Sequence, residues 1–281
     1  MPTRLKKKIY YEDVGSAKIK KCYGVIAMVD ALGTRNYSLD ECINFLEKRQ
    51  ELIQRSFQRW EVASSHAKES KNNSKKKIHF LSFADTLIVA IEMLEFSSKS
   101  DKIKFPSGNL EADSLFYGMW LERLSWVMGD LLRDGLIEKI VFRGAISVGE
   151  YLFDRESKSI LGPTMNDVAN WYEAFDCNGI ILTPHASLII EYLATKRKYF
   201  DSIIKTEIPF KNNTTKECYV VNWPNSFCRG DYSDENIKKA TNTFLSSLTQ
   251  LTIPSGAEDR YKVAQSFFNE VISNKKMNKK S

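Results

Sequence analysis

The sequence has no long apolar run, no CxxC motif and only three histidines, and each absence excludes a class of protein. No apolar stretch approaches the roughly 20 residues of a membrane-spanning helix, and the first residues lack the apolar core of a signal peptide. The five cysteines are scattered, without a nearby histidine pair, which favours reduced thiols over a zinc site or a disulfide framework. We therefore expect a cytoplasmic protein without a membrane partner.

An organised nucleic-acid surface is also missing, although the formal net charge is +6. Lysines and arginines gather in short runs such as Lys68 to Lys77, without interleaved aromatic residues. Such runs are typical of solvated loops and tails, whereas surfaces for single-stranded nucleic acid combine basic and aromatic residues. We expect no nucleic-acid partner. We also expect no catalytic histidine, because the histidines have no nucleophile or second ligand spaced to them.

Apolar residues make up 43% of the 281 residues, enough for a large buried core. The segments follow one another as strand, helix, strand pair, helix, strand, helix and strand, which predicts a mixed sheet covered by helices. The expected strands are Tyr23 to Asp30, a pair within Ile78 to Leu94, Ile137 to Glu150, Gly179 to Thr183 and Glu217 to Trp223. The expected helices are Leu39 to Ala63, Leu110 to Leu132 ended by Gly135, Gly162 to Ala174, Pro184 to Ala194, Ser233 to Leu251 and Glu258 to Ile272.

The stretch VIAMVDALGT ends an apolar strand on one carboxylate, Asp30, and places Gly33 three residues later. A second strand pair carries Asp85 in the sequence SFADT, where a tight turn would present it beside the end of the first strand. Either aspartate alone is explained as a cap of a turn. As a pair at adjacent strand ends they can hold Mg²⁺ or Mn²⁺, and Gly33 lets backbone amides approach phosphate. The hypothesis is a metal site that handles a nucleoside triphosphate.

Four segments carry a resemblance to a known family: VDALGT, FADT, RGAISVG at residues 143–149 and GPTMNDVA at residues 162–169. Together they resemble the ordered motifs of class III nucleotidyl cyclases, over about residues 23–183, by order and spacing rather than continuous identity. Within that superfamily they most resemble the pyrimidine cyclases of bacterial Pycsar anti-phage defence. The resemblance implies an α+β fold with a ferredoxin-like or palm-like βαββαβ core, whose sheet is mixed and mostly antiparallel.

The resemblance also implies roles for single residues. Asp30 and Asp85 would bind two Mg²⁺ or Mn²⁺ ions with the backbone carbonyl of Ala31, Asn166 would orient the ribose, and Arg143 would be a further catalytic residue. The ribose 3′-hydroxyl would attack the α-phosphorus and expel pyrophosphate, with catalysis mainly from charge and positioning. The positions expected at the substrate are Ala31, Leu32, Gly33, Thr34, Arg35, Tyr37, Leu81, Ser159 and Asn170.

Three positions depart from the family pattern. Purine cyclases carry a Lys four residues before the second Asp and an Asp three residues before the GxxxN motif, and here these positions are Leu81 and Ser159. Neither side chain makes the purine contacts, so the resemblance implies UTP or CTP rather than ATP or GTP. Four residues after Asn166, where the purine enzymes place a transition-state Arg, this chain has Asn170.

Simpler explanations stay open for two residues. Arg35 or Arg143 would neutralise phosphate in place of the missing Arg, but Arg143 is equally explained as the buried ion-pair partner of Glu150 or Asp30. Tyr37 is placed either to stack on a small base or to act as the hydrophobic staple of the helix that follows.

The resemblance implies a homodimer with sites across its interface, in which one subunit supplies the metal ligands and the other supplies Asn166. Cyclic UMP is favoured over cyclic CMP by family frequency alone, and a separate effector activated by the cyclic nucleotide would act downstream. One rival is a degenerate cyclase-like domain that binds nucleotide and regulates a partner without turnover, which Asn170 favours. Another is a metal-dependent nucleic-acid enzyme with a palm-like site, marked by salt-sensitive binding.

The expected domains are an N-terminal arm (residues 1–21), a catalytic domain (22–195) and a C-terminal helical extension with a basic tail (196–281).

Overall fold

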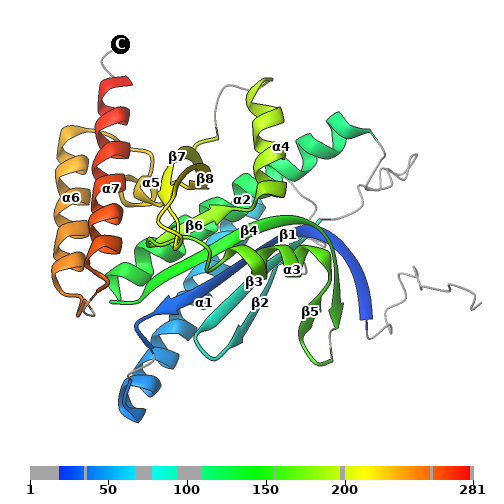
Figure 1. Cartoon of the computed structure of the whole chain (residues 1–281), viewed down its shortest axis with the longest axis horizontal. Helices are drawn as coiled ribbons and strands as arrows, with labels where there is room; N and C mark the ends of the chain where they lie inside the picture. The colour runs from blue at the N-terminus through cyan, green and yellow to red at the C-terminus, as the bar shows by residue number, and fades with distance from the viewer. Residues whose placement is uncertain are drawn as a thin grey trace, which may run out of the picture.

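One mixed sheet runs through the computed structural model, which describes residues 19–34, 37–66, 78–93, 109–154, 156–196, 200–253 and 256–278. The sheet order is β2-β3-β1-β4-β6-β8-β7, and β5 pairs with β4 off this path. The strands are β1 (Ile19–Leu32), β2 (Ile78–Phe83), β3 (Thr86–Glu92), β4 (Val141–Asp154), β5 (Ser159–Leu161), β6 (Gly179–Leu182), β7 (Ile203–Pro209) and β8 (Thr215–Val221). The helices are α1 (Leu39–His66), α2 (Leu110–Ile137), α3 (Pro163–Trp171), α4 (Pro184–Ala194), α5 (Trp223–Cys228), α6 (Asp234–Thr249) and α7 (Glu258–Asn278) (Figure 1).

The first six elements form a βαββαβ unit. Antiparallel pairs join β2 to β3, β3 to β1 and β1 to β4. Beyond this unit β6 runs parallel to β4, while β8 and β7 continue the sheet in antiparallel pairs. The expected α+β fold, with a mixed and mostly antiparallel sheet covered by helices, is confirmed. No helix among these residues combines the length and the apolar character that crossing a membrane requires.

The two faces of β1 have different neighbours. Val25 and Val29 are fully buried on the face covered by α2, whose Gly135 lies against the ring of Phe142, the register partner of Ala31. The other face carries Asp30, and α3 crosses that face over β4 and β1 (Figure 1). Because side chains alternate along a strand, β1 faces α2 with one set of residues and carries Asp30 in the other set.

Side-chain caps explain where two of the helices begin. Ser38 and Glu41 form a capping box before α1: the Glu41 N–H donates to Ser38 Oγ (3.3 Å) and the Ser38 N–H donates to Glu41 Oε2 (2.7 Å). The hydroxyl of Ser233 accepts from the Asn236 N–H at the start of α6.

The predicted end of α2 at Gly135 is wrong, because the helix continues to Ile137. The positive φ that follows the helix belongs to Lys139, at 66°. Gly135 is required for space instead: a Cβ there would lie 2.8 Å from both the carbonyl oxygen of Ile140 and the ring of Phe142. The glycine therefore lets the helix approach β4 rather than ending it.

Residues after 196 contribute more than the expected strand and two helices. The sequence predicts neither β7 nor α5, yet the β7–β8 hairpin extends the same sheet. After the hairpin, α6 and α7 pack against α5, where Phe244, Phe267 and Phe268 contact Trp223. The three-part division of the chain stays a prediction. Residues 1–18 of the expected arm, the Lys68 to Lys77 run and the end of the basic tail after residue 278 lie outside the described residues.

Candidate functional site

The end of β1 and the β2–β3 turn bring Asp30 and Asp85 to adjacent strand ends. Asp30 pairs in register with Thr86 of β3, whose hydroxyl donates to Asp30 Oδ1 at 3.3 Å. Asp85 lies in the turn itself, where Ala84 adopts a φ of 50°. The Ala31 N–H donates to the carbonyl oxygen of Asp85 at 3.1 Å. This bond ties the turn to the end of β1 and holds the two carboxylates on neighbouring pieces of backbone.

The loop that follows β1 is joined to the same turn. Gly33 adopts a φ of 89°, and no atom lies within 4 Å of the position that a Cβ would take, so the glycine is required for its backbone conformation. The Thr34 hydroxyl donates to Asp85 Oδ2 at 2.6 Å. Leu32 is half-buried and packs on the core. Arg35 lies outside the described residues.

Negative charge at this site exceeds what the neighbouring groups compensate. Burial raises the pKa of the Asp30 carboxyl, and the charge of Asp85 raises it further. The charge of Arg143 and the hydrogen bond from Thr86 oppose this rise, while Glu173 adds to it, and the net pKa of Asp30 is raised. A divalent cation between the carboxylates would relieve this repulsion.

The donor set fits a hard cation. Asp30, Asp85 and the carbonyl of Ala31 supply oxygen atoms alone, which suit Mg²⁺ or Mn²⁺ better than Zn²⁺. Among the described residues no group of three His, Cys, Asp or Glu side chains is arranged to hold a metal. Mg²⁺ is usually held by one or two carboxylates together with water and substrate phosphates, so two carboxylates meet its needs.

Arg143 is a buried cation without an ion pair. The residue is 5% exposed, its Nε has no hydrogen-bond partner, and no described carboxylate forms an ion pair with it. Glu150, one of its expected partners, pairs with Lys21 instead. Asp30, the other, is its neighbour in register on β1 but makes no ion pair with it. A buried and unpaired charge is costly in a protein that binds nothing, and such groups mark functional sites.

Two residues that the sequence does not single out for this site, Glu173 and Lys211, contribute charge near Asp30. The hydrogen bond from Tyr172 is the main reason that the pKa of Glu173 is lowered; burial opposes this, while Lys211 and Arg143 add to it. Lys211 Nζ lies 3.5 Å from Glu173 Oε2. Their chain positions gave no local signal, because the β7–β8 hairpin reaches the end of α3 only in the folded chain.

Two further expected residues, Asn166 and Asn170, lie on α3. Both are exposed, and no described hydrogen bond joins either side chain to Asp30 or Asp85. Within one chain the α3 amides are therefore not joined to the carboxylates by a hydrogen bond between described residues.

Three further expected residues have ordinary surroundings. Leu81 is half-buried on β2 and packs on the core. Ser159 is exposed on β5 and accepts a hydrogen bond from Ser157 Oγ at 2.9 Å. The ring of Tyr37 packs edge-on against Phe45, with 6.1 Å between ring centroids. Phe45 lies three residues beyond Cys42, the position that a staple would contact, so both explanations for Tyr37 stay open.

Comparisons with known proteins place few limits on this chain. No family model matches it, and no curated protein matches it. Among solved structures, the crystal structure of the catalytic core of a rhodopsin-guanylyl cyclase with converted specificity, in complex with ATPαS, is similar to it with a TM-score of 0.40 and 10% identity, over 73% of this chain and 98% of that chain. At this TM-score the likeness carries no argument about activity, substrate or metal.

Proposed function

We propose that the chain is a metal-dependent nucleotidyl cyclase of the class III type, which converts UTP or CTP to the 3′,5′-cyclic monophosphate and pyrophosphate. One observation carries the proposal: two carboxylates, Asp30 and Asp85, lie at adjacent strand ends beside Arg143, a buried guanidinium without an ion pair. A triphosphate bound together with divalent cations would supply opposite charges to the two carboxylates and to Arg143. The cations offset the carboxylates, and the phosphate oxygens offset the arginine.

Each residue of the site has a distinct task in this reaction. Asp30, Asp85 and the carbonyl of Ala31 would hold the cations, which when bound neutralise phosphate oxygens and favour ionisation of the ribose 3′-hydroxyl. Thr86 and Thr34 hold the two carboxylates in place. The ribose 3′-oxygen forms a bond to the α-phosphorus, the bond to the bridging oxygen of the β-phosphate breaks, and the hydroxyl proton leaves to solvent.

Arg143 would stabilise the phosphate charge in place of the Arg that purine cyclases carry at the position of Asn170. As negative charge grows on the departing pyrophosphate, a guanidinium already desolvated by the fold stabilises it without first giving up a partner in the protein. Asn170 is neutral and exposed on α3, so it cannot supply that charge. Arg143 is therefore assigned to the phosphates.

The residue types at the positions where purine cyclases bind the base favour a pyrimidine. An aliphatic side chain at Leu81 and a short hydroxyl at Ser159 leave no Lys and Asp pair to bind a purine edge. UTP is favoured over CTP by the resemblance alone. In a Pycsar-type defence system the product would be a second messenger, and the effector that it activates need not touch this chain.

A second copy of the chain would complete the site. The exposed amides of Asn166 and Asn170 have no described bond to the carboxylates of their own chain. In a homodimer with sites across the interface, Asn166 of one copy would orient the ribose held at Asp30 and Asp85 of the other. The carboxylates and the α3 amides of one chain would then belong to different sites.

One alternative has specific support. A domain that binds nucleotide and regulates a partner without turnover would keep Asp30, Asp85 and Arg143 but would not need the family Arg, which Asn170 replaces. Both functions predict nucleotide binding, and only the cyclase predicts a product.

The deciding experiment incubates the purified protein separately with UTP, CTP, ATP and GTP in the presence of Mn²⁺ or Mg²⁺. We expect pyrophosphate and a cyclic pyrimidine nucleotide, identified by mass spectrometry. Asp30→Ala and Asp85→Ala should abolish the product with unchanged circular dichroism, whereas Asp40→Ala, at an exposed aspartate in the first turn of α1, should keep it. Binding without product from any triphosphate would favour the regulatory domain, and full turnover by Asp30→Ala would disprove the metal assignment.

A further inference from the structure

A chain of polar groups links α4, β4 and α3 through the buried part of the sheet. The Ala186 N–H donates to Thr183 Oγ1 at 3.4 Å. The Thr183 hydroxyl donates to Ser147 Oγ at 3.1 Å, and the Ser147 hydroxyl donates to Asp167 Oδ2 at 2.6 Å. All three donors point the same way, so the relay begins at the first turn of α4 and ends on a negative charge carried by α3.

The relay lies among apolar groups. Ser147 and Thr183 are 0% exposed, and Asp167 is half-buried. Ser147 pairs in register with Ile26, which is itself fully buried. A buried hydroxyl in such surroundings costs free energy unless it is bonded, and bonds in series polarise one another in a low dielectric. An apolar residue at the position of Ser147 would pack as well in these surroundings. We therefore explain the polar relay by its effect on the placement of α3.

The relay is one of two anchors that fix α3 on β4. At the start of the helix the Thr164 hydroxyl donates to the carbonyl oxygen of Glu150 at 2.8 Å. Gly149 makes room for this contact, because a Cβ there would lie 2.7 Å from Thr164 Oγ1. The bond from Ser147 to Asp167 is the second anchor, three residues further along the helix. Two anchors nearly one turn apart determine both the depth and the rotation of the helix.

The rotation of α3 decides where its amide side chains point. Thr164 and Val168 are turned inward and buried, while Asn166 and Asn170 are exposed. Asn166 directly precedes Asp167, so a rotation of the helix about its axis that moves one carries the other with it. Without the bond to Asp167, only the bond of Thr164 and the packing of Val168 would hold the helix, and the direction of Asn166 would be less fixed.

We propose that Asp167 is a positioning residue, which through Ser147 and Thr183 fixes the rotation of α3 and thereby aims Asn166 and Asn170 at the substrate. The substrate in this inference rests on the proposed function. The anchoring of α3 does not rest on it, and can be measured without turnover.

The experiment compares Asp167→Ala, Asp167→Asn and Ser147→Ala with the unmodified protein. Amide hydrogen exchange of the peptide that spans residues 162–172 reports on the anchoring, and kcat and KM with UTP and Mn²⁺ report on the consequence. We expect faster exchange in Asp167→Ala and Ser147→Ala, and a fall in kcat of up to about 100-fold with a smaller change in KM, because a displaced ribose contact acts mainly in the transition state. Asp167→Asn should restore both, since its amide oxygen still accepts from Ser147.

Ser187→Ala is the matched control. The Ser187 hydroxyl donates to the carbonyl oxygen of Leu182 at 3.3 Å in the first turn of α4, and Ser187 is outside the relay, so its loss should change neither readout. Asp167→Ala with unchanged exchange and unchanged kcat overturns the proposal, as does Asp167→Asn that behaves like Asp167→Ala. If the unmodified protein makes no cyclic product from any triphosphate, the proposed function fails, while the exchange of α3 still decides whether the relay anchors it.

Discussion

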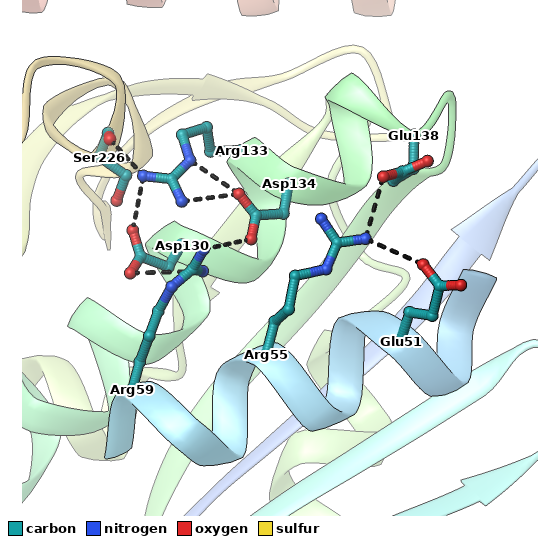
Figure 2. A network of polar contacts seen from close by, with 8 residues as sticks. All are labelled: Glu51, Arg55, Arg59, Asp130, Arg133, Asp134, Glu138 and Ser226. Atoms are coloured by element: carbon teal, nitrogen blue, oxygen red, sulfur yellow. Dashed lines mark hydrogen bonds and ion pairs between the residues drawn. The ribbon is translucent and has the colours of Figure 1, made fainter. Parts of the chain in front are cut away.

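Two arginines in this fold are equally hidden from solvent and differ in how their charge is met. Arg133 and Arg143 are each 5% exposed. Arg133 donates through Nε and Nη2 to Asp134 Oδ1 at 2.8 and 2.6 Å, and through Nη1 to the carbonyl oxygen of Ser226 at 2.7 Å (Figure 2). Arg143 makes no hydrogen bond or ion pair with a described residue, and its Nε is buried without a partner.

The surroundings of Arg133 form a network that joins three helices. Arg59 of α1 reaches Asp134 at 2.7 Å and Asp130 at 3.5 Å on α2, while Arg133 reaches Ser226 of α5 (Figure 2). Burial still raises the pKa of Asp130, with the charges of Arg133 and Arg59 opposing the rise and Asp134 adding to it. Cations and anions alternate through this cluster, so each guanidinium has an anionic partner within the chain, although Arg59 Nη1 is buried without a hydrogen-bond partner.

The contrast separates a cation that stabilises the fold from one for which we propose a ligand. A buried charge costs free energy. The protein offsets this cost with hydrogen bonds and ion pairs around Arg133, and we propose that the charge of Arg143 is kept because it serves substrate binding. Burial alone does not distinguish the two cases, whereas the bonds of each guanidinium do. Substitutions at the two positions should therefore have opposite effects on stability and on activity.

Arg143→Met should give the largest effect, and on activity rather than on stability. We expect kcat/KM for the cyclisation of UTP to fall by about 100- to 1,000-fold, since a preorganised phosphate contact is lost. The free energy of unfolding should change little, because the guanidinium has no hydrogen bond or ion pair with a described residue to lose, while its charge offsets part of the repulsion at Asp30. Arg143→Lys keeps the charge without the planar fork and should restore activity only in part. A large loss of stability in a urea titration of Arg143→Met would instead group Arg143 with Arg133.

Arg133→Met should give the reverse pattern. Its loss leaves the buried carboxylates of Asp130 and Asp134 with Arg59 alone, and we expect the free energy of unfolding to fall by about 3 kcal/mol. Arg55→Met is the matched control in the same network, because Arg55 pairs with Glu51 and Glu138 at the partly exposed end; it should cost no more than about 1 kcal/mol. Urea denaturation measures both. Equal losses would show that the contribution of Arg133 to the free energy of unfolding does not depend on its burial.

Glu92 extends the comparison to pH. It is 7% exposed at the far end of the sheet face that carries Asp30, where Lys20 pairs with it and His79 Nε2 lies 3.9 Å away. Burial alone would raise the pKa of Glu92, but the hydrogen bond from Lys20 and the charges of Lys20 and His79 outweigh it, and the pKa is lowered from 4.5. The folded state therefore favours the ionised form, and this stabilisation is complete above pH 4.5 and lost as the pH falls through the lower folded value.

Glu92→Gln should accordingly lower the free energy of unfolding by about 1 kcal/mol at neutral pH. The difference from the unmodified protein should shrink in acid, once Glu92 is protonated in both states. Urea titrations from neutral pH down to about pH 3 test this. A difference that stays constant over that range would mean that packing, and not charge, sets the role of Glu92.

Periodicity in the sequence predicts most elements of this fold and few of their tertiary neighbours. The strand that ends at Asp30 and the strand pair around Asp85 stand out, because a single carboxylate interrupts each apolar run. β7 was missed although Lys205 and Glu207 alternate with less exposed residues, which is the pattern of a half-buried strand. The end of α2 was misplaced at Gly135, where close approach to β4, and not termination, requires the glycine.

The rest of the site depends on contacts between distant parts of the chain. Lys211 reaches Glu173 because its N–H donates to the carbonyl oxygen of Ala174 at 3.2 Å, beside the bridge between Phe175 and Phe210. Nothing in the local sequence of either segment predicts that meeting. The same holds for the bond between Ser147 and Asp167, which needs the packing of α3 on β4. Sequence patterns identify lone carboxylates on strands, but not partners that tertiary packing brings together.

Asp30→Asn should give the smallest effect, on the stability of the protein in EDTA. Burial and the charge of Asp85 raise the pKa of Asp30, so its ionised form destabilises the fold at neutral pH and stability rises as the pH falls through the folded pKa. Removing the charge keeps an acceptor for Thr86 and should raise the free energy of unfolding by at most about 1 kcal/mol, since solvent screens a partly exposed site. Asp134→Asn is the control, and should destabilise because Arg133 and Arg59 meet its charge. If thermal unfolding shows that both variants lower the stability, the protein itself compensates the charge of Asp30, as it does that of Asp134, and no metal ion is needed to explain the charge.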